Sequence, residues 1–415
     1  MLYRTMPKTK EPLSILGFGC MRLPTANRGI DEQAALKLVD MALERGVTYF
    51  DTAVPYHMGA SEPFLGRALA RDGKRSKVKI ATKLPHWQTS TKRDMEAVFS
   101  SQLANLQTDV IDYYLVHSLN ADTWARARAA GVIEFLEKAK RDGRIRFAGF
   151  SYHGSREGFK PIVDAWNWDF CQIQYNILDE QNQAGTAGLE YAASKGLGVV
   201  IMEPLRGGNL ARTPPSEIQA VWNRAAVKRS PAEWALRWVW NRPEVTVVLS
   251  GMTLPEHLEE NVRIAEAALP GSLSADELSL AGEAATAYRR LMKVGCTGCQ
   301  YCLPCPAGVD IPGCFDAYNN FHLFQDRSAA GFYLIRMSGA LGKPALASQC
   351  VRCGACLKKC PQSLPIPDLL PDVAKTFEGP LFRIKAAGLK TAVKVQRLWT
   401  LFKDKLEASR KKKRA

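Results

Sequence analysis

The chain has 415 residues, of which 46% are hydrophobic, and a formal net charge of +15 at pH 7. This length accommodates a barrel of about 250 residues together with a second, smaller domain. No run approaches the roughly 20 apolar residues that span a bilayer, and the N-terminal segment lacks the apolar stretch of a signal peptide, so we expect a cytoplasmic protein rather than a membrane-spanning one.

Short β-rich runs alternate with amphipathic helical stretches up to about residue 290, which is the pattern of parallel βα units. Asp31 is the predicted N-cap of a helix that Gly46 ends, and Ser230 precedes a helix that begins with Pro231. The pattern favours an α/β fold with a closed (β/α)8 TIM barrel, and a doubly wound open sheet is the competing topology. The eight predicted strands are one within residues 14–24 and those at residues 47–50, 78–82, 112–117, 145–151, 170–176, 198–202 and 245–250.

Four ionisable side chains lie where predicted strands end. Asp51 follows the second strand directly, Lys83 follows the third, His117 ends the fourth, and Tyr56 lies in the loop after Asp51. In a barrel these loops converge on one face, so the four side chains are candidates for one site. An ammonium held by a carboxylate would lower the pKa of a neighbouring phenol from its usual value near 10, which would make Tyr56 a proton donor, while His117 would orient a carbonyl.

Five segments carry a family resemblance: GFGCMRLP, YFDTAVPYHMGASE, IATKLP, DYYLVHSL and IRFAGFS. They resemble the aldo-keto reductases over about residues 12–270, and the Asp, Tyr, Lys and His tetrad of that family matches Asp51, Tyr56, Lys83 and His117. The resemblance implies hydride transfer between NAD(P)H and a carbonyl or alcohol substrate, with Tyr56 as general acid for reduction and general base for oxidation.

The same resemblance implies a set of cofactor-binding residues. Ser151 and Gln172 would contact the nicotinamide carboxamide, and the loop containing Arg206 would lie near the pyrophosphate, with Arg206 adding charge. Met202, Tyr152, Gly251 and His257 depart from residues common in the family, so NAD and NADP both remain candidates and flavin is a further alternative. The remaining implied residues are Glu203, Pro204, Leu205 and Gly207 at the pyrophosphate and Ser250, Gly251, Met252, His257 and Asn261 around the adenosine.

Nine of the eleven cysteines lie between residues 296 and 360, which indicates metal ligation rather than disulfides. A third equally spaced cysteine in each run favours 4Fe-4S clusters over the paired knuckles of a zinc ribbon. Cys20, Cys171 and Cys314 are expected to be buried thiols. The two runs are Cys296, Cys299, Cys302 and Cys305, followed by proline, and Cys350, Cys353, Cys356 and Cys360, again followed by proline.

The cysteine-rich segment resembles two-cluster bacterial ferredoxins, in which the fourth cysteine of each run binds the other cluster. That resemblance implies one cluster on Cys296, Cys299, Cys302 and Cys360 and another on Cys350, Cys353, Cys356 and Cys305. We therefore expect a barrel over residues 1–293, a small ferredoxin-like iron-sulfur domain over residues 294–378 and a basic, amphipathic tail over residues 379–415.

The tail holds most of the charge. Residues 375–415 contain thirteen Lys or Arg against three Asp or Glu, and Leu398, Trp399 and Phe402 lie among them. No nucleic-acid-binding fold accompanies this charge, so nucleic acid is not an expected partner. The tail is interpreted either as a solvated end or as a surface for an acidic partner or for peripheral membrane contact.

The leading functional hypothesis joins the two domains. A hydride carries two electrons, so carbonyl reduction alone has no need of one-electron carriers. We expect the clusters to pass electrons between the barrel and a ferredoxin-like or quinone-linked partner. The alternatives are an ordinary carbonyl reductase with structural or redox-sensing clusters and a non-catalytic electron-transfer subunit.

Overall fold

The structure is a computed structural model that describes residues 1–26, 29–325, 327–340 and 343–391. The chain forms two compact units. The first consists of Met1–Pro214 and Gln219–Ala285, and the second of Pro215–Ile218 and the chain from Thr286 on. The division therefore lies inside helix α11 (Ala275–Leu291), a few residues before the domain boundary expected at residue 293.

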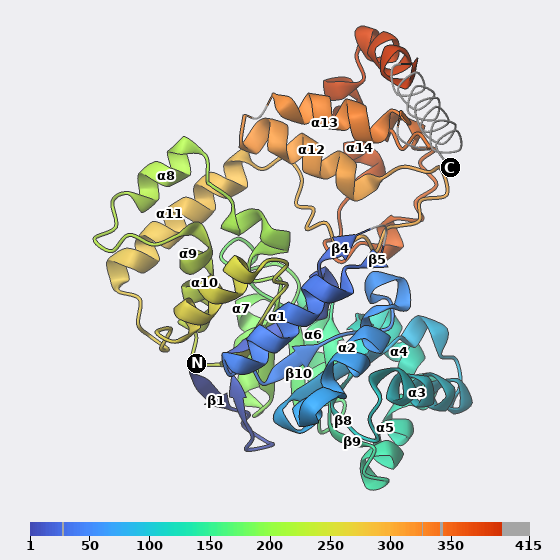
Figure 1. Cartoon of the computed structure of the whole chain (residues 1–415), viewed down its shortest axis with the longest axis vertical. Helices are drawn as coiled ribbons and strands as arrows, with labels where there is room; N and C mark the ends of the chain where they lie inside the picture. Colours follow the sequence, from blue (N-terminus) through green and yellow to red (C-terminus); the bar gives the residue numbers. More distant parts are fainter. Residues whose placement is uncertain (27–28, 326, 341–342, 392–415) are drawn as a thin grey trace, which may run out of the picture. The chain divides into compact units, whose positions relative to one another are not determined.

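The first unit is a closed barrel of eight parallel strands in the order β10-β11-β12-β3-β6-β7-β8-β9 (Figure 1). This arrangement confirms the predicted TIM barrel and excludes the open sheet, because β12 pairs with β3 and completes the ring. Each predicted strand overlaps an observed one. The strands are β3 (Leu16–Gly19), β6 (Tyr49–Asp51), β7 (Lys79–Leu84), β8 (Ile111–Leu119), β9 (Ile145–Tyr152), β10 (Phe170–Gln174), β11 (Gly198–Met202) and β12 (Val245–Ser250).

Helices alternate with the strands and begin at the expected caps. The Asp31 carboxylate accepts a hydrogen bond from the Ala34 N–H at 3.1 Å, and the Ser230 hydroxyl accepts one from the Glu233 N–H at 3.0 Å. Gly46 has a positive φ of 82° directly after the first helix, a conformation that glycine adopts without strain. The helices before α11 are α1 (Glu32–Glu44), α2 (Ser61–Leu69), α3 (Lys92–Leu106), α4 (Ala121–Ala129), α5 (Val132–Arg141), α6 (Arg156–Asp164), α7 (Gly185–Ser194), α8 (Ser216–Trp222), α9 (Pro231–Trp240) and α10 (Pro255–Ala265).

An N-terminal hairpin fills the end of the barrel where the strands begin. Its strands, β1 (Tyr3–Thr5) and β2 (Pro12–Ser14), are antiparallel, and its Met6 and Leu13 are buried in one cluster with inward-facing barrel residues. A side chain at Gly198 would lie 1.9 Å from the sulfur of Met6, so the contact requires glycine. With this end closed, the opposite end of the strands is the one open to chemistry. A second short hairpin joins β4 (Thr25–Ala26) and β5 (Gly29–Ile30).

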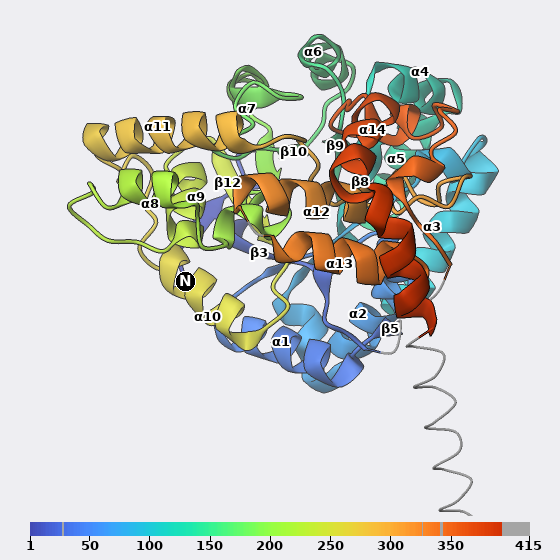
Figure 2. The ribbon, with the colours of Figure 1, turned by 90° about the horizontal axis from the view of Figure 1, so that it is seen from above.

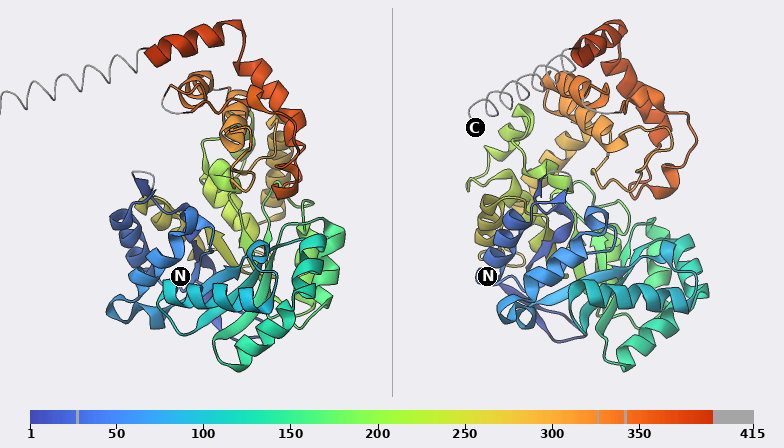
Figure 3. Two further views of the ribbon diagram at one scale, coloured as in Figure 1. Left: turned by 90° about the vertical axis from the view of Figure 1, so that its right-hand side faces the viewer. Right: turned by 45° about the vertical axis from the view of Figure 1, so that its right-hand side comes forward.

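The second unit is mainly helical, with α12 (Ile311–Leu323), α13 (Ser328–Met337) and α14 (Ile366–Phe377) packed around one apolar core (Figure 2). The two loop segments before α12 and before α14 carry the cysteine runs. Residues 380–391 are also helical (Figure 3). Phe382 and Ala386 of this segment are buried in the same core. The rest of the predicted tail, residues 392–415, lies outside the described residues. Among the described helices none has the length and apolar character required to cross a membrane.

Candidate functional site

Three neighbouring strands and one loop bring the predicted tetrad together. Asp51 ends β6, Lys83 lies in β7 and His117 in β8, and these strands pair consecutively in the barrel. Tyr56 begins the short helix η2 (Tyr56–Gly59) in the loop after β6. All four side chains are buried, and Tyr56 retains 8% exposure. The tetrad therefore lies where the strands end.

Lys83 is the centre of the group. Its ammonium donates hydrogen bonds to Asp51 Oδ1 at 2.7 Å, to the Thr52 carbonyl at 2.7 Å and to the Tyr56 hydroxyl at 3.3 Å. The His117 ring meets the Tyr56 ring edge-on, with 6.4 Å between centroids. The amine, carboxylate and phenol thus form a continuous hydrogen-bonded chain that His117 flanks.

The electrostatics of Tyr56 differ from the sequence expectation. Burial raises the pKa of the Tyr56 hydroxyl well above its ordinary value, and the negative charge of Asp51 raises it further. The expectation of a lowered pKa was wrong, because desolvation of a phenolate and the nearby carboxylate outweigh the ammonium of Lys83. Tyr56 is therefore a protonated phenol at neutral pH.

Burial also sets the charge of the two flanking groups. It lowers the pKa of His117 well below 6.5, with Lys83 as the next cause, so the imidazole is neutral at pH 7. Burial raises the pKa of Asp51, and the attraction of Lys83 opposes that shift. The site consequently offers a neutral imidazole and a neutral phenol beside a compensated ion pair.

A buried polar layer supports Lys83 from behind. Gln102 donates to Glu62 Oε1 at 2.7 Å and to the Lys83 carbonyl at 3.1 Å, and Thr82 donates to the same Glu62 oxygen at 2.5 Å. The Tyr114 hydroxyl donates to Gln102 at 2.7 Å. These bonds fix the backbone of β7 at Lys83.

Two side chains beside the tetrad were missed by the sequence analysis. The Trp87 ring, 48% exposed, lies 5.1 Å from the His117 ring, and His153 donates to or accepts from Gln183 at 3.1 Å. Burial is the main reason that the pKa of His153 falls to about 4, and Lys83 contributes to the same shift. Both residues follow a barrel strand closely, so the strand-end rule that identified Lys83 applies to them as well.

The residues expected at the nicotinamide lie side by side. Gln172 of β10 pairs in register with Ser151 of β9, and both are 1% exposed. Ser151 Oγ accepts a hydrogen bond from the Ser118 N–H at 2.7 Å. Gln172 Oε1 is buried and has no hydrogen-bond partner among residues in the described part of the chain. A carboxamide N–H would satisfy this oxygen, so the pair fits a nicotinamide.

The loop expected at the pyrophosphate has an unusual backbone. Glu203 and Arg206 have φ values of 55° and 48°, and Gly207 and Gly208 have φ values of 70° and 97°. Pro204 and Leu205 lie between the first two residues. Residues with positive φ values that follow one another closely bend a loop tightly and turn backbone N–H groups toward one side.

Arg206, which was expected to add charge at the pyrophosphate, is paired inside the protein. Its side chain is buried, and its Nε lies 3.2 Å from Asp179 Oδ2. The same oxygen accepts hydrogen bonds from Gln174 at 2.8 Å and Asn176 at 3.0 Å. An internal carboxylate thus partly compensates the charge of Arg206 and ties its side chain to Asp179.

The residues expected around the adenosine begin with Ser250 at the end of β12 and continue into α10. Asn261 of α10 donates to Ser250 Oγ at 3.0 Å, and Met252 is buried. His257 pairs with Thr253 at 3.3 Å. A side chain at Gly251 would lie 2.9 Å from Cβ of Arg22, so glycine is required there.

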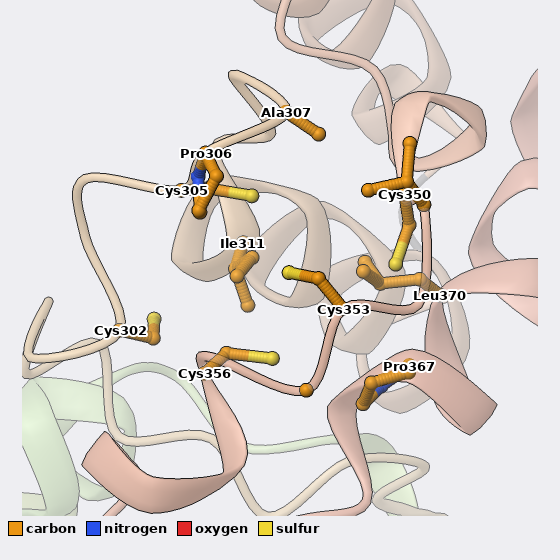
Figure 4. Close-up of a pocket in the computed structure, with 12 residues that line it drawn as sticks. Cys302, Cys305, Pro306, Ala307, Ile311, Cys350, Cys353, Cys356, Pro367 and Leu370 are labelled. Atoms are coloured by element: carbon orange, nitrogen blue, oxygen red, sulfur yellow. The ribbon is translucent and has the colours of Figure 1, made fainter.

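The cysteines of the second unit surround two cavities. One is lined by Cys350, Cys353, Cys356 and Cys305, whose sulfurs point into a shared space (Figure 4). The other is lined by Cys296, Cys299, Cys302 and Cys360, and Cys302 also borders the first cavity. All four members of each crossed ligand set thus line one cavity, and Cys302 lines both.

Both cavities suit a polynuclear cluster. The other residues that line them are largely apolar. Ile311 lines both cavities, Leu370 lines the first and Phe315 lines the second. Within the described chain, no group of three or more His, Cys, Asp or Glu side chains is close enough for a single ion. Burial and then the neighbouring cysteines raise the pKa of Cys302 to about 12, so bound iron would have to stabilise the thiolate.

The remaining thiols are buried, as expected. Cys314 lies in α12 with its sulfur 3.8 Å from the Tyr333 hydroxyl and 3.7 Å from the Ala345 carbonyl. It lines neither of the two cavities. Cys171 lies in β10, whereas Cys20 lies in the short helix η1 (Cys20–Arg22) just after β3 rather than inside a strand.

Comparisons with known proteins agree with this architecture. Residues 15–275 match the Aldo/keto reductase family, and residues 295–364 match the 4Fe-4S dicluster domain. The chain is 36% identical over 298 residues to the aldo-keto reductase YhdN of Bacillus subtilis, which covers 62% of this chain and 87% of the relative. It is 26% identical over 327 residues to the NADH-specific methylglyoxal reductase of Escherichia coli, covering 68% of this chain and 98% of the relative.

Among solved structures, the holo form of the aldo-keto reductase AKR11C1 from Bacillus halodurans superimposes with a TM-score of 0.59 at 28% identity. That match covers 68% of this chain and 96% of the other. The family acts on small-molecule carbonyl compounds with a nicotinamide cofactor. The family match extends over more than half of the chain, and the chain therefore belongs to the aldo/keto reductase family, as an oxidoreductase whose barrel is followed by a 4Fe-4S dicluster domain.

Proposed function

We propose that the barrel reduces a small carbonyl compound with NADH or NADPH and that Tyr56 donates the proton. The observation that carries this proposal is the Tyr56 hydroxyl, protonated and 3.3 Å from the Lys83 ammonium, at the end of the barrel where the strands end. A phenol with a raised pKa remains able to protonate an alkoxide, which is a much stronger base than a phenolate.

Each member of the tetrad has a separate task. A bound nicotinamide would supply the hydride to the carbonyl carbon. Tyr56 delivers its proton to the carbonyl oxygen, so that an alcohol forms without a free alkoxide. Lys83 orients the Tyr56 hydroxyl, and Asp51 holds Lys83. The neutral His117 imidazole donates a hydrogen bond that fixes the carbonyl.

The cofactor would be held by three groups of residues. Ser151 and Gln172 would bind the carboxamide, since Gln172 offers a buried acceptor. Backbone N–H groups of Leu205 and Gly207 would bind the pyrophosphate, because those of Arg206 and Gly208 already donate within the loop, at 3.0 and 2.9 Å. The Arg206 side chain would support the loop through Asp179. The Escherichia coli relative is named as NADH-specific, so comparison of KM for NADH and NADPH is the direct measurement of preference. Extraction of bound cofactor from the purified protein would identify a flavin.

We infer that the two cavities hold two 4Fe-4S clusters with the crossed ligand sets. The clusters would exchange single electrons with a ferredoxin-like or quinone-linked partner. Because a nicotinamide exchanges electrons in pairs and each cluster takes one, complete transfer of a hydride requires both clusters or an intervening flavin. Adding substrate or oxidised nicotinamide to the dithionite-reduced protein should reoxidise the clusters, and unchanged spectra would contradict this coupling.

A structural role for the clusters is the second candidate. It is favoured by the packing of Cys296, Cys305 and Cys360 against the apolar core of the second unit. Serine replacement of Cys353 and Cys356 distinguishes the two. Folded protein that loses iron but retains full carbonyl reduction would support the structural role.

Replacement of Tyr56 by phenylalanine tests the catalytic proposal. With methylglyoxal as the probe, Tyr56→Phe should lower kcat/KM by about 10²–10⁴-fold, because it removes the proton donor. Tyr49→Phe is the matched control, since the buried Tyr49 hydroxyl has no hydrogen-bond partner within the described residues. Equal activity of Tyr56→Phe and wild type would contradict the proposal and revive the non-catalytic alternative.

A further inference from the structure

The last described helical segment has two distinct faces. Phe382 and Ala386, four residues apart, are buried against the core of the second unit. Leu381 directly precedes Phe382, Ile384 lies between the two buried residues, and these two side chains are 63% and 68% exposed. One face of this segment therefore packs against the core of the second unit, and another face exposes large apolar side chains.

Helix α13 exposes a second apolar pair. Its Tyr333 ring lies 6.1 Å from the Phe382 ring, which places the two helices in contact. On α13, Phe332 and Ile335 are 67% and 44% exposed, and they are three residues apart, as are Leu381 and Ile384. Two adjoining helices thus each expose an apolar pair at helical spacing.

The charge around these pairs is positive. Arg383, Lys385 and Lys390 are exposed, and no ion pair to them occurs among the residues that the structure describes. Glu378 is the one acidic residue between positions 375 and 391, and it faces inward, where it accepts hydrogen bonds from the Tyr333 hydroxyl at 2.6 Å and the Ser348 N–H at 3.2 Å. No carboxylate of this stretch is left to neutralise the exposed cations.

We propose that this surface, made of Phe332, Ile335, Leu381 and Ile384 with the surrounding Arg383, Lys385 and Lys390, docks the protein on an anionic phospholipid membrane. Exposed large apolar side chains flanked by cations match the boundary between headgroups and acyl chains, where the apolar groups insert and the cations remain at the phosphates. An acidic protein surface would satisfy the cations but leave the apolar pairs without a comparable environment.

The sequence beyond the described residues agrees with this occupant. Residues 392–415 contain nine Lys or Arg against two Asp or Glu, together with Leu398, Trp399 and Phe402. Each basic residue near an anionic membrane contributes on the order of 1 kcal/mol, so these residues add to the attraction whatever their conformation. The composition supplies both terms of membrane binding, charge and apolar surface.

Vesicle co-sedimentation of the full-length holoprotein tests the proposal. The protein should sediment with vesicles that contain phosphatidylglycerol at low salt, and not with pure phosphatidylcholine vesicles. Replacing both Leu381 and Ile384 by asparagine should weaken binding about a hundredfold, because each apolar side chain inserted contributes roughly a factor of ten. The matched control replaces Leu269 and Leu278, which are 57% and 40% exposed in the barrel unit, by asparagine and should bind as wild type does.

The binding results distinguish an anionic membrane from an acidic protein as the partner of this surface. Failure to bind phosphatidylglycerol vesicles, or equal binding by the Leu381 and Ile384 double variant, would overturn the proposal. Retention on immobilised polyglutamate without vesicle binding would overturn it in favour of an acidic protein partner. Iron content and circular dichroism of the double variant should equal those of wild type, because both side chains are exposed.

Discussion

The two units assemble their reactive side chains in opposite ways. In the barrel, Asp51, Lys83 and His117 come from three adjacent strands, and bonds within the protein already join two of them. In the second unit, each proposed ligand set takes three cysteines from one short loop and the fourth from the other run, and its four members line one cavity. The charges of the barrel site are compensated internally, whereas the cysteine cavities bring together mostly half-buried thiols without a cation beside them.

The two sites also differ in the source of their stability. The buried ammonium of Lys83 has a carboxylate partner at 2.7 Å, so the barrel site is complete as protein. None of the described residues that line either cysteine cavity is Lys or Arg. Four thiolates in such a lining need bound cations, and iron-sulfur clusters would supply them. We therefore expect the two units to respond differently to the loss of a charge and to the loss of iron.

The largest expected effect is that of Lys83→Met. It leaves Asp51 buried without its cation, which should cost about 3–5 kcal/mol of unfolding free energy and abolish most carbonyl reduction. Lys79→Met on the same strand is the matched control, because Lys79 and its partner Glu11 are 26% and 22% exposed and such pairs contribute about 0–1 kcal/mol. Urea denaturation and kcat/KM measure both variants. Equal losses of unfolding free energy and of kcat/KM in the two variants would contradict the expectation that the buried Lys83–Asp51 pair contributes more than the Lys79–Glu11 pair.

Removal of iron should next affect the second unit selectively. Anaerobic chelation should unfold the segment after about residue 290, because the cavity cysteines pack against its small core and cluster binding contributes to its folding. The barrel should survive as a protease-resistant fragment that keeps its near-ultraviolet dichroism. Simultaneous loss of both units would show that the barrel depends on the clusters.

The pH dependence should reflect the protonated state of Tyr56. Its pKa is raised, so the phenol keeps its proton below and through pH 9, and the rate of reduction should be constant from about pH 7 to 9. Oxidation needs the phenolate, so its rate should rise about tenfold per pH unit over the same range. His117 stays neutral there, because its pKa is lowered. A rate of carbonyl reduction that falls above pH 7 would instead indicate that the pKa of Tyr56 is lowered.

The smallest effect is expected for the cysteine outside the cavities. Cys314→Ala should cost about 1 kcal/mol of unfolding free energy in the second unit, since it removes one buried sulfur and weak contacts. Its iron and sulfide content should equal that of wild type, whereas Cys360→Ala should lose one cluster. A lower iron content in Cys314→Ala than in wild type would show that Cys314 is a cluster ligand outside the proposed sets.

Local patterns account for what the sequence alone could predict. The alternation of apolar and polar residues predicted the strands, and cap residues such as Asp31 and Ser230 predicted where helices begin. Both features depend only on neighbours within one strand or one helical turn. Strand-end position also placed Asp51, Lys83 and His117 on one face, and cysteine spacing indicated clusters. Trp87 and His153 satisfied the same rule but went unnoticed.

The tertiary structure decided what depends on burial and on distant partners. The direction of the Tyr56 pKa shift follows from desolvation and from Asp51 together, and neither magnitude is visible in a list of residue types. Likewise Arg206 is compensated by Asp179, 27 positions earlier in the chain, and the N-terminal hairpin fills one end of the barrel. Spacing along a chain determines local structure, whereas electric fields and packing arise only when remote segments meet in three dimensions.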